Sequence, residues 1–128
     1  MTQKEYLTRL CEDNKDAVII GSLGTISYDL KDIEHPNKIL IKGAMGAAIG
    51  AGLGYAMNSD KEVIVVVGDG SFLMKMGMIS TVQRLHPTNL RIIIINNDCY
   101  LSCGKQPTFF FAVKQMLPYE VFEPTLPA

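Results

Sequence analysis

Residues 63–100 read VIVVVGDGSFLMKMGMISTVQRLHPTNLRIIIINNDCY, and this stretch decides the fold. Its two runs of β-branched residues, 63–67 and 92–95, have the length and composition of buried parallel strands. Polar residues follow each run directly, Gly68-Asp69-Gly70-Ser71 after the first and Asn96-Asn97-Asp98 after the second, and one helix-length segment separates the two runs. Strands joined by such a crossover point the same way, so both polar tips lie at one edge of the sheet. Ligands of open α/β sheets bind at that carboxyl edge.

The two tips carry groups that suit a phosphate and a divalent metal ion. Gly68 and Gly70 let the backbone turn tightly and approach a ligand, and the helix that begins near Ser71 presents free N–H groups to an anion. Asp69 supplies a carboxylate and Asn97 an amide oxygen. Hard oxygen ligands beside phosphate oxygens are what Mg²⁺ requires. The tips therefore predict a site for a phosphate and magnesium.

Composition limits the classes of fold and partner. A chain of 128 residues fits one domain, near the lower end for a three-layer α/β architecture. Its 12 basic and 13 acidic residues give a net charge of −1 and form no basic stripe, so we expect no nucleic-acid partner. Cys11, Cys99 and Cys103 form no CxxC pair, which disfavours a disulfide framework or a zinc site and is typical of reduced cytoplasmic thiols.

Neither secretion nor a membrane span is indicated. The first residues, MTQKEYLTRLCEDNKD, carry charges throughout and lack the apolar core of a signal peptide. The segment 44–57 is apolar but contains four glycines and is shorter than the roughly 20 residues that span a bilayer. We therefore expect a buried helix there and a cytoplasmic protein without membrane contact.

Apolar spacing extends the pattern of strands and helices to the rest of the chain. The sequence predicts an α/β fold, a three-layer parallel sheet with helices on both faces. The expected helices are 2–13, 28–35, 44–57 and 72–85, and the expected strands are 17–20, 38–41, 63–67 and 92–95.

Glycines recur every four residues in the helix expected at 44–57, at Gly46, Gly50 and Gly54. Each is a poorer helix former than alanine by roughly 1 kcal/mol. Such a face is tolerated where a neighbouring backbone comes close, so we expect these three glycines to pack on the sheet.

A turn that contains glycine and hydroxyl residues, 21–27, follows the strand at 17–20. Its hydroxyls offer a second contact for a phosphate. The alternative is a plain strand-to-helix turn with Ser27 as the N-cap, because serine is an ordinary cap.

The paired motifs resemble those of the thiamine diphosphate enzymes, whose cofactor-binding domain carries Gly-Asp-Gly, a spacer of helix length, and Asn-Asn after a hydrophobic strand. The resemblance implies that Asp69, the side chain of Asn97 and the main-chain carbonyl of Cys99 coordinate Mg²⁺. The metal would anchor the diphosphate of the cofactor.

Two further segments share this resemblance. In the family, a glycine carbonyl at the place of Gly43 accepts a hydrogen bond from the aminopyrimidine, and a large apolar residue at the place of Met45 wedges between the cofactor rings. Methionine suits a wedge because it is bulky, apolar and adaptable, and the alternative is that Met45 is an ordinary core residue. The decarboxylase branch places hydroxyls that touch the diphosphate at Thr25 and Ser27.

The resemblance extends from about Ala17 to Thr108. Gly104-Lys105-Gln106-Pro107-Thr108 looks like the Gly-Gly-Gln-Pro-Thr loop of sulfopyruvate and phosphonopyruvate decarboxylases, with Lys105 in place of the second glycine. The chain is thus similar to the β-type subunits of 2-oxoacid decarboxylases. The family's domain normally continues for several tens of residues, so residues 1–128 are expected to form a cofactor-binding domain that is shortened at its C-terminus.

In such enzymes the glutamate that activates the aminopyrimidine belongs to a separate pyrimidine-binding domain, for which this chain offers no candidate. The resemblance therefore implies no catalytic residue here. It implies a hetero-oligomer in which a pyrimidine-binding α-type subunit supplies the glutamate. The implied activity is that of a carbon–carbon lyase that decarboxylates a small anionic 2-oxoacid, with the thiazolium ring as electron sink.

Three alternatives share the metal motif. A 2-oxoacid:ferredoxin oxidoreductase β subunit would need cysteines spaced for an iron–sulfur cluster, which these three do not supply. A carboligase of the acetolactate synthase type would keep the same cofactor residues and differ in the fate of the substrate. A non-catalytic subunit could retain the cofactor fold, and titration with cofactor in the presence and absence of a partner would separate it from the enzymes.

Overall fold

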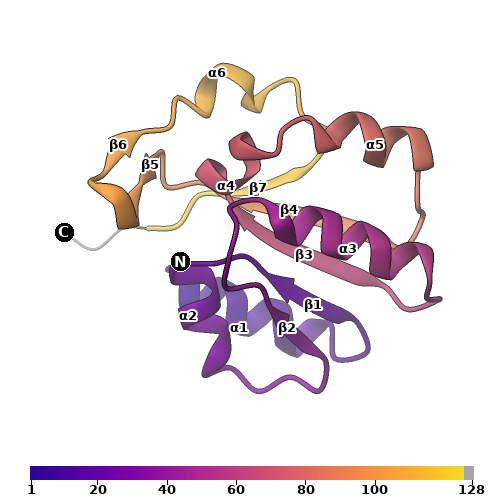
Figure 1. The fold of residues 1–128 in the computed structure, drawn as a ribbon. Coiled ribbons are helices and arrows are strands. Elements are labelled where there is room, and N and C mark those ends of the chain that lie inside the picture. The colour runs from indigo at the N-terminus through magenta and orange to yellow at the C-terminus, as the bar shows by residue number, and fades with distance from the viewer. Residues whose placement is uncertain (126–128) are drawn as a thin grey trace.

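The computed structural model describes residues 1–125 and contains a five-stranded sheet in the order β2-β1-β3-β4-β7 (Figure 1). Every neighbouring pair of these strands is parallel. The strands are β1 (Val18–Gly21), β2 (Lys38–Leu40), β3 (Val63–Gly68), β4 (Leu90–Ile95) and β7 (Glu120–Phe122), and β5 (Cys99–Tyr100) pairs separately with β6 (Gln106–Pro107). The helices are α1 (Gln3–Asp13), α2 (Thr25–Lys31), α3 (Ala47–Met57), α4 (Asp69–Met74), α5 (Met78–Leu85) and α6 (Phe111–Lys114), with a 3₁₀ turn η1 at Leu101–Cys103.

Alternate side chains of β3 enter two separate hydrophobic clusters, one on each face of the sheet. Val65 packs with α3, α4 and α5, whereas Ile64 and Val66 pack with α1 and α2. Figure 1 shows α1 and α2 on one side of the sheet and α3 and α5 on the other. The period of two in a strand separates the faces, and burial on both faces explains why the strand is apolar throughout. The predicted three-layer α/β fold is therefore confirmed.

The register of the sheet brings the two polar tips together. Gly68 at the end of β3 pairs with Ile95 at the end of β4, and Gly21 at the end of β1 pairs with Val66. The residues that follow β1, β3 and β4 therefore emerge at one edge, as the parallel arrangement requires. The site described below is built at this edge.

The helix predicted at 72–85 is wrong, because two helices occupy this stretch. α4 begins at Asp69, directly after β3, and ends at Met74; α5 begins at Met78. Glycine is a poor helix former, and Gly77 precedes the first residue of α5. The break lets α4 stay at the edge of the sheet while Val82 of α5 reaches the hydrophobic cluster.

The helix after β1 also begins earlier than predicted. α2 starts at Thr25, and Gly24 precedes it with φ of +85°, a conformation that glycine adopts readily. Ser27 lies inside α2, so the alternative that it caps the helix is wrong. Lys38 holds the other end of α2, because its ammonium group donates to the carbonyls of Leu30 at 2.7 Å and Ile33 at 2.5 Å.

The expected glycine face of α3 does not pack on the sheet. Gly50 and Gly54 are exposed, and Gly46 lies before the first residue of α3 with φ of +84°. Gly52 makes the close approach instead, since a Cβ atom there would lie 2.1 Å from Cγ2 of Val65. The face of α3 that meets the sheet is thus turned from the predicted one.

Substituting two glycines of α3 separates packing from helix propensity. Gly52→Ala should lower the free energy of unfolding by about 1–3 kcal/mol, because its methyl group would overlap Val65 of β3. Gly54→Ala should raise it by up to about 1 kcal/mol, since nothing lies within 4 Å of a Cβ there and alanine favours a helix. Urea unfolding of both variants measures the difference. Equal shifts in the two variants would contradict the packing of α3.

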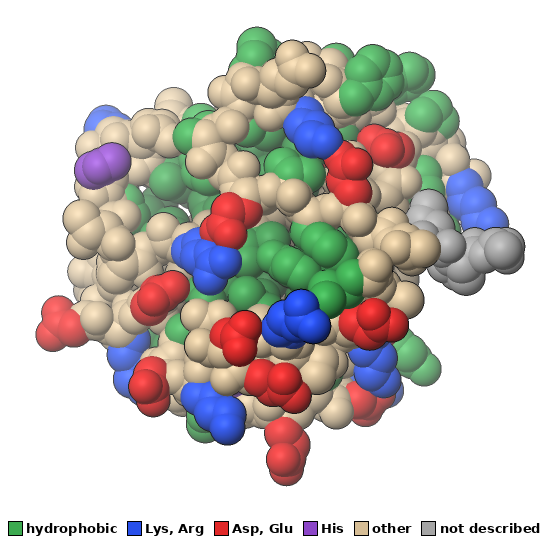
Figure 2. Space-filling view, turned by 180° about the vertical axis from the view of Figure 1, so that it is seen from behind, with side chains coloured by type: hydrophobic (Ala, Val, Ile, Leu, Met, Phe, Trp, Pro, Cys, Tyr) green, Lys and Arg blue, Asp and Glu red, His purple; other side chains and the backbone are tan. Residues whose placement is uncertain are grey.

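The C-terminal part of the chain was not predicted and adds to both faces. β7 extends the sheet beyond β4, and Phe122 stacks on Tyr6 with ring centroids 3.9 Å apart. Phe110 is fully buried, whereas Phe109 and Phe111 are 60% and 67% exposed. Hydrophobic side chains accordingly gather over α6 along the top of Figure 2. Acidic and basic side chains are mixed over the lower part of this face. The expected shortening after Ala128 lies outside the described residues.

Within residues 1–125, no helix combines the length and the apolar character needed to cross a bilayer. Residues 47–57 of the segment 44–57 form α3, which buries Ile49 and Leu53 against the sheet. The buried helix predicted in this segment is therefore confirmed from Ala47 onwards, and residues 44–46 belong to the loop before it.

Candidate functional site

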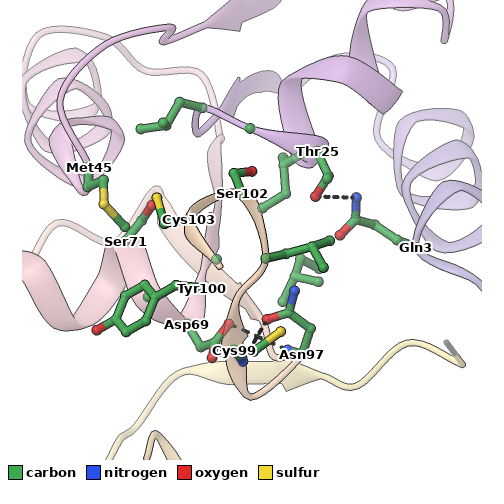
Figure 3. Close-up of a pocket in the computed structure, with 17 residues that line it drawn as sticks. Gln3, Thr25, Met45, Asp69, Ser71, Asn97, Cys99, Tyr100, Ser102 and Cys103 are labelled. Carbon is green, nitrogen blue, oxygen red and sulfur yellow. Dashed lines mark hydrogen bonds between the residues drawn. The ribbon is translucent and has the colours of Figure 1, made fainter. Parts of the chain in front are cut away.

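A cavity opens at the carboxyl edge of the sheet, where the chain leaves β1, β3 and β4 (Figure 3). Its volume is about 110 Å³, and it is open to solvent. Its walls come from the N-terminus of α2, the loop before α3, the start of α4 and the segment 97–103. The lining residues are Gln3, Leu23, Gly24, Thr25, Ile26, Met45, Gly68, Asp69, Gly70, Ser71, Ile95, Asn97, Cys99, Tyr100, Leu101, Ser102 and Cys103.

Asp69 is the charged centre of this cavity. It is only 2% exposed, and its Oδ2 accepts a hydrogen bond of 2.6 Å from the hydroxyl of Thr108. Its Oδ1 accepts a longer bond of 3.4 Å from the backbone N–H of Asn97. Burial raises the pKa of Asp69, and the two hydrogen bonds oppose that rise.

The surroundings of Asp69 fit a bound cation. Two ion pairs occur within residues 1–125, and Asp69 belongs to neither. A buried carboxylate with only neutral donors is unfavourable, because its desolvation is not offset by an opposite charge. A divalent cation in the cavity would provide that charge.

Asn97 and Cys99 lie beside Asp69 and complete a set of oxygen donors. The backbone N–H of Cys99 donates to Oδ1 of Asn97 at 3.2 Å, which fixes the amide group of Asn97. Figure 3 shows the three residues at one end of the cavity, joined by this chain of hydrogen bonds. Residues 1–125 contain no cluster of three His, Cys, Asp or Glu side chains able to hold a metal ion. One carboxylate, neutral oxygens and ligand phosphates are, however, the donor set that Mg²⁺ uses.

The glycine-rich tip after β3 lies against the aromatic ring of Tyr100. A Cβ atom at Gly70 would lie 2.7 Å from Cδ1 and Cε1 of that ring, so only glycine permits this contact without movement. Gly68 precedes the first residue of α4, and Ser71 is buried in its first turn. The structure thus places Gly68, Gly70 and Ser71 in the cavity, as predicted, and gives Gly70 a packing role that the sequence did not reveal.

The structure separates the four remaining predicted residues into two pairs. Thr25 and Met45 line the cavity, with Met45 next to Ser71 in Figure 3. Gly43 is exposed and lies outside the lining, as does Ser27. The hydroxyl of Ser27 donates to the carbonyl of Ser22 at 2.5 Å, a bond that uses its proton within the fold.

Several lining residues were missed from the sequence. Gln3 reaches the cavity from α1 and donates to Oγ1 of Thr25 at 3.3 Å and to Asp29 at 2.8 Å. No local pattern marks Gln3, because only the packing of α1 beside α2 brings it there. Tyr100 and Cys103 belong to the segment between the Asn-Asn tip and the loop 104–108. The similarity of that loop to a family loop was the one signal in the sequence that this segment lies near the site.

Comparison with known proteins identifies the family. The model of "Thiamine pyrophosphate enzyme, C-terminal TPP binding domain" matches residues 20–127. The chain belongs to the thiamine pyrophosphate enzyme family. The Gly-Asp-Gly and Asn-Asn tips that form the cavity both lie within the matched residues.

The sequence relatives within this family include named decarboxylases. Sulfopyruvate decarboxylase subunit beta of Methanothermobacter thermautotrophicus is 36% identical over 106 residues, which cover 82% of this chain and 57% of the relative. The same subunit of Methanocaldococcus jannaschii is 42% identical over 94 residues, 71% and 49% of the two chains. Phosphonopyruvate decarboxylase of Streptomyces viridochromogenes is 36% identical over 105 residues, 81% and 26%. The chain thus spans about half the length of the two β subunits.

A solved structure supports the fold independently of the sequence. The 2-oxoglutarate:ferredoxin oxidoreductase of Magnetococcus marinus superimposes with a TM-score of 0.64 at 20% sequence identity. The match covers 81% of this chain and 36% of that chain. At this identity the likeness shows the fold alone.

Proposed function

We propose that this chain is the β-type, cofactor-binding subunit of a thiamine diphosphate- and Mg²⁺-dependent decarboxylase. The observation that carries the proposal is the buried carboxylate of Asp69, which faces a cavity beside the oxygens of Asn97. The matches to sulfopyruvate and phosphonopyruvate decarboxylases support the reaction class and a small anionic 2-oxoacid as substrate.

Each donor in the cavity has a part in holding the cofactor. Asp69, the side chain of Asn97 and the carbonyl of Cys99 would bind Mg²⁺, whose positive charge offsets the buried carboxylate. The hydroxyl of Thr25 accepts from Gln3, so its own proton remains available to donate to a diphosphate oxygen. When bound, thiamine diphosphate supplies the ring that takes up the electron pair released as carbon dioxide leaves.

The remaining cofactor contacts would come from the loop before α3 and the tip after β3. Gly68, Gly70 and Ser71 would hold the diphosphate, and Met45, which lies beside Ser71, would limit the position of the rings. Gly43 and Ser27 lie outside the cavity lining, so their proposed contacts require the loop or the cofactor to extend beyond it.

The activity requires a partner that supplies the activating acid. Asp69 is the one carboxylate among the lining residues of the described chain, and it is assigned to the metal. We therefore place the activating glutamate on a pyrimidine-binding α-type subunit, so that the site is complete only in a hetero-oligomer. The names of the β-subunit relatives support such an assembly, and the free cysteines fit a cytoplasmic location.

Calorimetric titration of the purified chain with thiamine diphosphate tests the cofactor assignment. We expect binding with Mg²⁺ present and its loss when EDTA removes the metal, because the diphosphate has no lysine or arginine among the described lining residues. Binding that EDTA leaves unchanged would reject the magnesium site. The same titration with the partner added separates a cofactor-binding enzyme subunit from a non-catalytic one.

Met45 offers a test of the cofactor's conformation. Met45→Ala should leave the diphosphate anchor at Asp69 intact but loosen the rings, so the turnover rate of the assembled enzyme should fall more than its cofactor affinity. Rate and affinity are measured by a carbon dioxide release assay at increasing cofactor concentration. Met74→Ala, at an exposed position of α4, is the control. Equal losses of rate and affinity would assign Met45 to packing instead.

A further inference from the structure

Thr108 lies behind the metal-binding end of the cavity and contacts both of its loops. It is 7% exposed, and its hydroxyl donates to Oδ2 of Asp69 at 2.6 Å. Its backbone N–H donates to the carbonyl of Asp98 at 3.1 Å. The backbone N–H of Phe110 approaches its Oγ1 at 3.4 Å, which leaves the hydroxyl proton directed to Asp69.

These contacts close the base of a hairpin that forms one wall of the cavity. β5 and β6 pair antiparallel, with Cys99 opposite Pro107 and Tyr100 opposite Gln106. Asp98 immediately precedes this hairpin and Thr108 immediately follows it, so the bond between them ties its two ends. The lining residues that the hairpin contributes are Cys99, Tyr100, Leu101, Ser102 and Cys103.

We infer that Thr108 is a positioning residue that couples the metal-binding carboxylate of Asp69 to this hairpin, defined as residues 99–107. Its hydroxyl donates to Oδ2 and holds the carboxylate in one orientation. Oδ1 accepts only the long bond of 3.4 Å from the N–H of Asn97, so it keeps a lone pair for the cation. A hydrogen bond to an ionised carboxylate is stronger than a neutral one. A cation bound at Oδ1 would therefore fix the carboxylate that anchors the hairpin, and a loss of the anchor would let the carboxylate rotate and weaken the metal site.

Most of the hairpin is exposed, so the contacts of Thr108 at its base position the cavity wall that it forms. Residues 101–107 are exposed, whereas Thr108 and Asp69 are buried together. The ring of Tyr100 also lies against Gly70 in the first turn of α4. Movement of the hairpin would displace Cys99, whose carbonyl belongs to the proposed metal site, and this inference thus rests on the proposed function.

The test compares Thr108→Val, which removes the hydroxyl, with Thr108→Ser, which keeps it. Mn²⁺ binding is followed by electron paramagnetic resonance with thiamine diphosphate present, and hydrogen exchange of residues 99–107 is followed with and without Mg²⁺ and the cofactor. We expect Thr108→Val to weaken Mn²⁺ binding about 10- to 100-fold, as outer-shell substitutions do. Its hairpin amides should exchange faster than in the wild type and gain no protection from the metal, whereas Thr108→Ser should behave as the wild type does.

The outcomes distinguish this inference from the proposed function. If the wild type binds Mn²⁺ and the cofactor, and Thr108→Val binds them equally well, the role of Thr108 is overturned and the metal site stands. Wild-type chain that fails to bind Mn²⁺ would overturn both. If valine prevents folding, Thr108→Ala replaces it. In either case, wild-type hairpin amides that gain no protection from Mg²⁺ and the cofactor would overturn the coupling.

Discussion

Replacing Asp69 with asparagine is expected to abolish Mg²⁺-dependent binding of thiamine diphosphate while the fold persists. Asparagine keeps the size of the side chain but removes the negative charge that offsets the metal ion, so we expect more than a ~100-fold loss of affinity, beyond what outer-shell substitutions cause. Asp69 lies at the first residue of α4, outside the two hydrophobic clusters of the sheet. Titration calorimetry on the variant, with circular dichroism to verify its fold, measures both properties.

Asp98→Asn is the matched control for this substitution. Asp98 is exposed two residues before the end of β5, and its φ of +61° is a conformation that asparagine also adopts. The control should bind the cofactor as the wild type does. Unchanged affinity in the folded Asp69 variant would reject the metal assignment.

Without the metal, Asp69→Asn is expected not to lower the stability of the fold, although it abolishes cofactor binding. Because burial raises the pKa of Asp69 in the folded state above its unfolded value, ionisation of this carboxyl opposes folding. That cost is absent below the unfolded-state pKa and develops as the pH rises through the folded-state pKa. In EDTA, Asp69→Asn should therefore be at least as stable as the wild type at pH 8, and this advantage should shrink towards pH 4. Thermal unfolding across this range measures the difference, and an advantage that grows on acidification would contradict it.

The purified chain alone is expected to have no decarboxylase activity and to acquire it only with a pyrimidine-binding subunit. No second carboxylate lines the cavity in the described chain, so no acid is placed to activate the cofactor. The exposed cofactor surface should also weaken binding until a partner covers it. The assay supplies Mg²⁺, thiamine diphosphate and a panel of small 2-oxoacids to the chain alone and to the mixture.

The assembled state must be measured in the same samples. Mass in solution shows whether the active species contains both subunits, and the mixture made with Asp69→Asn should remain inactive. Products larger than the decarboxylated substrate would indicate the carboligase alternative. Robust turnover by the chain alone would reject the two-subunit site and place the activating acid within these residues.

The carboxyl edge could be predicted because it follows from strand geometry alone. The apolar runs of β3 and β4 are separated by one crossover, so Asp69 and Asn97 had to meet whatever the rest of the chain did. The resemblance to a family added Met45 and Cys99, which line the same cavity. Only the assignments of Asp69 and Asn97 followed from the order of the elements and the period of the strands.

Details that depend on helix phase or on distant contacts could not be predicted. Gly52, and not Gly54, faces β3, because the phase of α3 is set by packing and not by the spacing of its glycines. Gln3 enters the cavity only because α1 packs beside α2. β7 was not predicted, and its place is decided by parallel pairing with β4 at the far end of the chain.

Anomalous diffraction from Mn²⁺ tests the central claim most directly. Crystals of the chain grown with thiamine diphosphate and Mn²⁺, with the partner subunit where it is needed for binding, locate the metal without any assumption about its ligands. The proposed site predicts one strong peak bound by a carboxylate oxygen of Asp69, Oδ1 of Asn97 and the carbonyl of Cys99. Bound cofactor whose metal peak lies away from Asp69, or that carries no metal peak at all, would contradict it.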